Sequence, residues 1–179
     1  MATKSKQIIV NAFLNKLEDS SYEEITISEV CANTALVRKT FYNNFSCKED
    51  IVKYVCKDLM TKYITELTSS NEFSLYHFSH TFFEFGKKNK EIFKLLIERK
   101  LFSIFKEEFI NSQFLISSIL PHNKLNRLNE VELNYVIVFH ASGVLAIFEI
   151  WVTSNFNKTT EEISQMYINI VKDIQEVTL

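Results

Sequence analysis

Residues 34–50, TALVRKTFYNNFSCKED, combine side chains that suit contact with an anionic partner. Between Val30 and Lys48 the charged residues are Arg38, Lys39 and Lys48, with no acid among them. Arginine and lysine can bind guanine O6 and N7, and their charge neutralises phosphates. Seven acidic residues balance the seven basic ones over positions 1–53. The positive charge is therefore local, and it predicts a small surface for double-stranded DNA.

Each side-chain type in this stretch has a possible role in DNA recognition. We expect Arg38 and Lys39, which begin a short helix, to read base edges. Lys48 lies in the first turn of the next helix, whose free N–H groups favour phosphate, so we expect it to contact only the DNA backbone. The other candidates carry hydroxyl or amide groups: Thr26, Ser28, Thr40, Tyr42, Asn43 and Asn44. The residue types alone fit a solvated surface helix equally well.

Two short helices around a tight turn must position these side chains. The residues TISE, from Thr26, form a Ser/Thr-x-x-Glu capping box that begins the first short helix. The second is expected over about 37–44, with Leu36, Phe41 and Phe45 as core anchors. A second capping box, Ser46 to Glu49, opens a long helix. This pattern predicts a helix-turn-helix, whose second helix enters the major groove.

The composition predicts an all-α fold. The chain has 179 residues but only two glycines and one proline, too few turn residues for a sheet-rich domain. We expect a DNA-binding domain at residues 1–47 and a helical domain at 48–179.

A net charge of −2 argues against a nonspecific nucleic-acid coat. Three cysteines and an opening without an apolar signal core indicate a cytoplasmic protein.

The segment ITISEVCANTALVRKTFYNNFSCKEDI resembles the DNA-binding segment of the tetracycline-repressor (TetR) family of regulators, over nearly all of residues 8–55. The matching positions are Thr26, Val30-Cys31, Thr34-Ala35-Leu36, Thr40-Phe41-Tyr42, Phe45 and Lys48-Glu49. Two positions depart from the family pattern. Ala35 replaces the turn glycine, where αL backbone would cost roughly 1 kcal/mol, and Val37 replaces a capping serine. The resemblance implies a second helical domain that dimerises and often binds an effector.

The last two helices are the predicted dimer interface. Tyr135, Phe139, Gly143, Ile147 and Trp151 step by four, which predicts a ridge for helix packing, and a last helix follows the Thr159-x-x-Glu162 cap. The expected interface residues are Gly143, Ile147, Ile150, Met166, Tyr167, Ile170 and Ile174. The alternative is that both helices close a core within one chain. A palindromic DNA site favours the dimer.

The sixteen phenylalanines suggest a small apolar effector, although each aromatic residue could also be plain core. The expected lining residues are Tyr63, Phe82, Phe85, Phe105, Phe109, Phe139, His140 and Trp151. His77 and His80 could share a metal ion, but without a nearby cysteine or carboxylate cluster we expect no metal site, no cofactor and no catalytic residues. Residues 135–152 have the length of a membrane span, yet His140 and Glu149 interrupt them, which predicts a buried helix and no membrane contact.

These patterns predict a dimeric, sequence-specific DNA-binding regulator that represses by excluding polymerase and is released by an apolar effector. Two alternatives remain. The second domain could bind a partner protein, so that the chain activates transcription, or the chain could be a helical ligand carrier with a non-functional DNA head.

Overall fold

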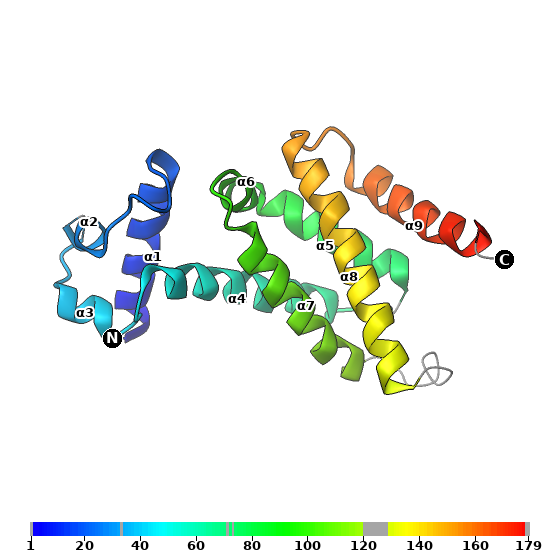
Figure 1. Ribbon diagram of the computed structural model, residues 1–179, viewed down its shortest axis with the longest axis horizontal. Coiled ribbons are helices and arrows are strands. Elements are labelled where there is room, and N and C mark those ends of the chain that lie inside the picture. Colours follow the sequence, from blue (N-terminus) through cyan, green and yellow to red (C-terminus); the bar gives the residue numbers. More distant parts are fainter. Residues whose placement is uncertain (1, 33, 71, 73, 120–128, 178–179) are drawn as a thin grey trace.

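The computed structural model describes residues 2–32, 34–70, 72, 74–119 and 129–177, and all regular structure in those ranges is helical, as predicted (Figure 1). The helices are α1 (Ala2–Asp19), α2 (Ile27–Ala32), α3 (Arg38–Tyr42), α4 (Lys48–Leu67), α5 (Leu75–Lys88), α6 (Lys90–Glu98), α7 (Phe102–Ile119), α8 (Glu130–Thr153) and α9 (Thr160–Val177).

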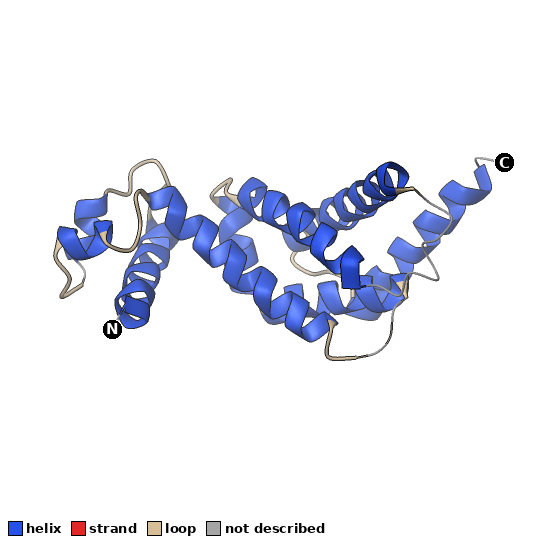
Figure 2. Ribbon diagram, turned by 90° about the horizontal axis from the view of Figure 1, so that it is seen from below, coloured by secondary structure: helices blue, strands red, loops and turns tan. Residues whose placement is uncertain are grey.

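A long helix connects two groups of helices. Helices α1 to α3 form a small head at one end of the elongated molecule, and α5 to α9 form a larger body (Figures 1 and 2). Helix α4 starts against the head and runs into the body, where it packs on α5 and α7. The predicted boundary between the two domains, at residues 47 and 48, stays a prediction. Helix α4 begins there and belongs to both groups, because it contacts the head at its start and the body further along.

Two of the predicted capping boxes are present. Glu29 accepts a hydrogen bond from the Thr26 N–H at 2.9 Å, and Thr26 Oγ1 accepts one from the Glu29 N–H at 3.3 Å. Thr159 and Glu162 make the same reciprocal pair, at 2.8 and 3.2 Å. Each box satisfies N–H groups that a helix start would otherwise leave unpaired.

The predicted capping box at the start of α4 is wrong by one residue. Helix α4 begins at Lys48 with Cys47 as its N-cap, and no side chain caps it there. The third helical residue is therefore Asp50 rather than Glu49. Asp50 Oδ2 accepts a hydrogen bond from the Ser46 N–H at 2.8 Å, and this bond is the main reason why the pKa of Asp50 is lowered.

A helix crossing in the body depends on a glycine. Gly86 in α5 is buried directly against the ring of Phe148 in α8, and a Cβ added to Gly86 would lie 2.1 Å from Phe148 Cε2. The Phe148 ring is fully buried, with ring centroids of Phe82 and Phe93 at 4.9 Å. The Phe148 ring of α8 can occupy this position on α5 only because residue 86 has no side chain.

Helix α8 is amphipathic rather than wholly buried, so the predicted buried helix is only partly correct. Tyr135 is 74% exposed and Phe139 is 54% exposed, whereas Trp151 is buried. A strict four-residue step advances by about 40° at each repeat, so Tyr135 and Trp151 differ by about 160° around the helix. By length and composition alone, α8 is the one helix in the described ranges that could cross a membrane, and a third of its most apolar window is buried.

Candidate nucleic-acid interface

Helix α3 presents a polar face to solvent and an aromatic face to the head. Phe41 is fully buried and Phe45 nearly so, with ring centroids 6.1 Å apart. Lys39 and Asn43 are exposed, and Tyr42 is 58% exposed with its ring packed edge-on against Phe41. Positions three and four apart share one side of a helix. Two predicted anchors, Phe41 and Phe45, therefore hold a helix whose free face carries Lys39, Tyr42 and Asn43.

The turn before α3 forms without glycine. Thr34 Oγ1 donates to the Cys31 carbonyl at 2.9 Å and accepts from the Leu36 N–H at 3.1 Å. Positive φ angles within the described residues occur at Lys100, Asn155 and Phe156, so the expected αL strain at Ala35 is absent. The Thr34 hydroxyl organises this turn instead.

Arg38 links the two short helices. Its guanidinium donates a hydrogen bond to Ser28 Oγ, across ten residues of sequence. A guanidinium has five N–H donors, so this bond leaves others free at the exposed start of α3. Val37, directly before Arg38, is the N-cap of α3 without a side-chain cap, as expected.

Two predicted DNA contacts also have structural roles inside the head. Asn44 Nδ2 donates to the Thr40 carbonyl at 2.7 Å, which satisfies an otherwise free carbonyl in the last turn of α3. Both side chains are only partly exposed, whereas Thr26 and Ser28 are exposed at the start of α2. Of the polar candidates, Tyr42 and Asn43 are therefore the most accessible on α3.

Lys48 has a different role from the phosphate contact expected above. Its Nζ donates to the carbonyls of Tyr22, Glu23 and Ile25 at 2.6, 3.0 and 3.1 Å, and it lies 4.4 Å from the centroid of the Tyr22 ring. An ammonium group has three donors, and here each has an acceptor. Lys48 thus fixes the loop between α1 and α2 to the start of α4.

The sequence patterns gave no reason to select the lysines at the start of α1. The first turns of α1 lie beside α3 in the head (Figure 1). Lys4 is exposed there, and Lys6 Nζ lies 4.5 Å from the Tyr54 ring centroid and 5.1 Å from that of Phe45. These two lysines add positive charge to the end of the head where α3 lies.

Arg99 ties the head to the body. Arg99 follows α6, and its Nε donates to the Leu17 carbonyl at 2.7 Å while Nη2 donates to the Glu18 carbonyl. These carbonyls belong to the last turn of α1, the end of the helix that carries partial negative charge. The contact joins residues 82 positions apart in sequence and fixes the orientation of α1 relative to α6.

The predicted effector-lining residues do not lie around one space. Five of them pack ring against ring in the core between α4, α5 and α7, with centroid distances such as 4.7 Å for Phe82 and Phe109: Tyr63, Phe82, Phe85, Phe105 and Phe109. Phe139 is exposed on α8. His140 Nδ1 lies 3.0 Å from the Tyr167 hydroxyl, and Trp151 Nε1 donates to the Lys158 carbonyl.

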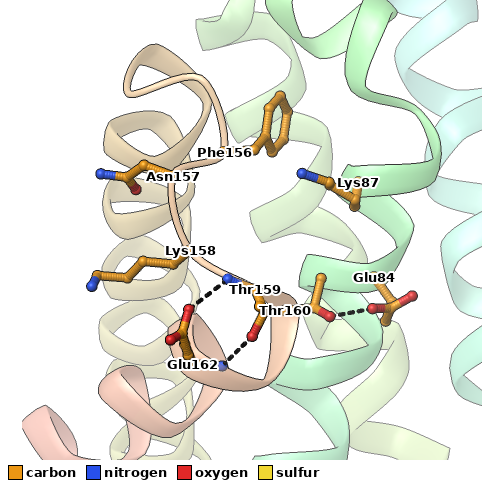
Figure 3. Close-up of a pocket in the computed structure, with 8 residues that line it drawn as sticks. All are labelled: Glu84, Lys87, Phe156, Asn157, Lys158, Thr159, Thr160 and Glu162. Carbon is orange, nitrogen blue, oxygen red and sulfur yellow. Dashed lines mark hydrogen bonds between the residues drawn. The ribbon is translucent and has the colours of Figure 1, made fainter.

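A polar pocket of about 500 Å³ opens at the junction of α5 and α9 (Figure 3). Its lining residues are Glu84, Lys87, Phe156, Asn157, Lys158, Thr159, Thr160 and Glu162. Lys87 Nζ lies 4.7 Å from the Phe156 ring centroid, and Thr160 Oγ1 donates to Glu84 Oε1. None of the predicted effector-lining residues lines this pocket, and seven of its eight lining residues have polar or charged side chains.

The predicted dimer residues fall on two sides of α8 and α9. Tyr167 is buried within the chain, and a Cβ added to Gly143 would lie at an ordinary 3.9 Å from Tyr167 Cε2. Ile147 and Met166 are partly buried against the core. Ile150 is 66% exposed and Ile170 is 39% exposed, while the side chain of Ile174 lies outside the described ones. The exposed apolar surface of α8 instead includes Tyr135, Phe139, Ala146 and Ile150.

Two solved structures share this fold over nearly their whole lengths. A TetR transcriptional regulator from Streptococcus agalactiae 2603V has a TM-score of 0.66 and 19% sequence identity, with 95% of this chain and 94% of that one aligned. The dihydroxyacetone kinase operon activator DhaS has a TM-score of 0.60 and 13% identity, with 97% of both chains aligned. No protein-family model and no curated protein matches the sequence.

Proposed function

We propose that this chain, which has the all-α fold of a TetR transcriptional regulator, is a sequence-specific DNA-binding regulator that acts as a dimer. The observation that carries the proposal is the exposed face of α3. It presents Lys39, Tyr42 and Asn43 on a short helix that Phe41 anchors and that Arg38 links to α2. A rigid helix with free basic and hydrogen-bonding side chains is what readout in the major groove requires.

The prediction for DNA binding separates reading residues from supporting ones. Lys39→Ala should cost about 1–3 kcal/mol of binding free energy and relax the preference at one position in each half-site. Lys48→Ala should reduce the stability of the head, because three carbonyls lose their donor, and leave the salt dependence of binding unchanged. Selection from a random DNA pool, followed by affinity measurements at two salt concentrations, checks both expectations.

Lys90→Ala is the matched control, since Lys90 is an exposed lysine on α6 in the body. It should bind like the wild type. If the wild type selects no palindrome, or if Lys39→Ala binds like Lys90→Ala, α3 is a solvated surface and the proposal is wrong.

The dimer is proposed to form through the exposed face of α8 with Ile170 of α9. Phe139, Ala146 and Ile150 share this face, and large apolar side chains are seldom left together in solvent without a partner. Ile150→Glu should therefore convert a micromolar dimer to a monomer in sedimentation equilibrium. Thr61→Glu, at an exposed position of α4, is the control and should leave the dimer intact.

A monomeric wild type at micromolar concentration would contradict the dimer and favour the second candidate function. In that case the exposed face of α8 would receive a partner protein and the chain would activate transcription. A shared fold with DhaS, which is named as an operon activator, is consistent with this alternative. We also propose repression, action in the cytoplasm and release by an effector, whose site would differ from the one predicted, because the predicted lining residues do not lie around one space.

A further inference from the structure

We propose that His80, Glu84 and Glu161 bind one divalent transition-metal ion of the zinc class at the junction of α5 and α9. One donor atom from each residue lies within 4.8 Å of the other two. Glu161 is distant in sequence, so the histidine pattern of α5 alone could not identify it. The site is independent of the proposed DNA interface.

Helices α5 and α9 bring the three proposed metal ligands close together. His80 and Glu84 are four residues apart and share a face of α5, and Glu161 lies in the first turn of α9. His80 Nε2 lies 3.9 Å from Glu161 Oε1. Ligands of one zinc ion, each bonded at about 2.1 Å, lie at most about 4.2 Å apart. This pair already meets that limit, and the other two pairs, within 4.8 Å, need a shift of at most about 0.6 Å to meet it.

Neighbouring groups orient two of the proposed ligands. The Tyr76 ring stacks on the His80 imidazole at 5.4 Å with an angle of 28° between the planes. The buried Thr160 donates its hydroxyl hydrogen to Glu84 Oε1, which leaves the other carboxylate oxygen for a metal ion (Figure 3). Outer contacts of this kind fix metal ligands and raise affinity.

The donor set selects the kind of ion. One neutral imidazole and two carboxylates balance a charge of +2 and match the nitrogen and oxygen ligands of zinc. Calcium takes six to eight oxygen ligands and magnesium an octahedral oxygen shell, so the histidine disfavours both. Lys87 does not neutralise the site, because its Nζ lies over the Phe156 ring.

His77 provides a contrast on the same helix. Its Nε2 lies 2.9 Å from Ser70 Oγ and 3.3 Å from the Leu67 carbonyl, so this ring is held at the end of α4. In the described part of the chain, no hydrogen bond involves a ring nitrogen of His80. The geometry therefore selects His80 rather than the pair of histidines.

The test is titration of the full-length protein with Co²⁺, read by visible absorption, and equilibrium dialysis with Zn²⁺. The wild type should bind one ion per chain. His80→Gln, Glu84→Gln and Glu161→Gln should each lower affinity by more than tenfold, and Thr160→Val by about tenfold. Glu91→Gln, at an exposed position of α6, and His77→Gln should bind like the wild type.

Far-UV circular dichroism without metal checks the folding of each variant. If the α5 variants His80→Gln or Glu84→Gln fail to fold, Glu161→Gln decides the outcome, because an exposed side chain can be replaced with little effect on folding. The proposal is overturned if the wild type binds no ion, or if binding survives in Glu161→Gln. DNA binding by the metal-free wild type is measured in the same series, so failure of the metal site and failure of the proposed function give different results.

Discussion

Replacing Gly86 by alanine is expected to lower the free energy of unfolding by about 3 kcal/mol. The new methyl group would lie 2.1 Å from Phe148 Cε2 and 2.7 Å from Cζ, well inside van der Waals contact. The Phe148 ring cannot swing away, because rings of Phe82, Phe93 and Trp151 surround it. Helices α5 and α8 would therefore have to separate. Urea unfolding followed by circular dichroism measures the loss.

Gly143→Ala is the matched control, since it makes the same change in a helix where the nearest side-chain atom is 3.9 Å away. Alanine favours a helix over glycine by up to about 1 kcal/mol, so this variant should be as stable as the wild type or more stable. Phe148→Leu in the Gly86→Ala background should recover part of the loss. Equal stability of the two alanine variants would show that the Phe148 ring does not pack directly on Gly86.

Arg99→Ala is expected to weaken DNA binding by on the order of a hundredfold, although Arg99 lies outside the head. A hydrogen bond from a charged donor contributes about 1.5–3 kcal/mol, and Arg99 makes two to the end of α1. Without them the head keeps its covalent link and its contacts to α4, and we expect both heads of a dimer to lose orientation that must be restored on binding. About 1.5 kcal/mol lost per head corresponds to this factor.

Affinity for the selected palindrome measures this effect, and Lys100→Ala provides the control. Lys100 is exposed directly after Arg99, so its removal changes the net charge equally without touching α1. Arg99→Lys keeps the charge but not the planar fork, and should give an intermediate affinity. If Arg99→Ala and Lys100→Ala bind DNA equally, the arginine contact does not orient the head.

Local sequence signals predicted the local structure of this protein well. The capping boxes at Thr26 and Thr159 are present, and Phe41 and Phe45 anchor α3 as expected. Such signals succeed because both partners of the interaction lie within one turn of helix. The box at the start of α4 failed because two neighbouring acids, Glu49 and Asp50, lie in its first turn, and Asp50 accepts the hydrogen bond from the Ser46 N–H.

The positions of side chains between distant segments could not be predicted. Lys48 was expected at a phosphate because it lies in the first turn of a helix. Its carbonyl partners lie 23–26 residues earlier, in a loop with no pattern of its own, so sequence could not identify them. The ridge through Tyr135 and Trp151 failed because a four-residue step is longer than a helical turn. The group of His80, Glu84 and Glu161 exists only after α9 packs on α5.

The distribution of the three cysteines makes the native protein a ready distance probe. Cys47 is exposed at the start of α4, next to the head, whereas Cys31 and Cys56 are buried. Burial, with a smaller effect of Glu108, raises the pKa of the Cys56 thiol to about 12, which keeps it unreactive at neutral pH. A thiol-specific spin label should therefore attach at one site per chain without any substitution. In a dimer, pulsed electron paramagnetic resonance would then report the spacing between the two heads, which must suit half-sites about 34–36 Å apart, or a multiple of that distance, on DNA.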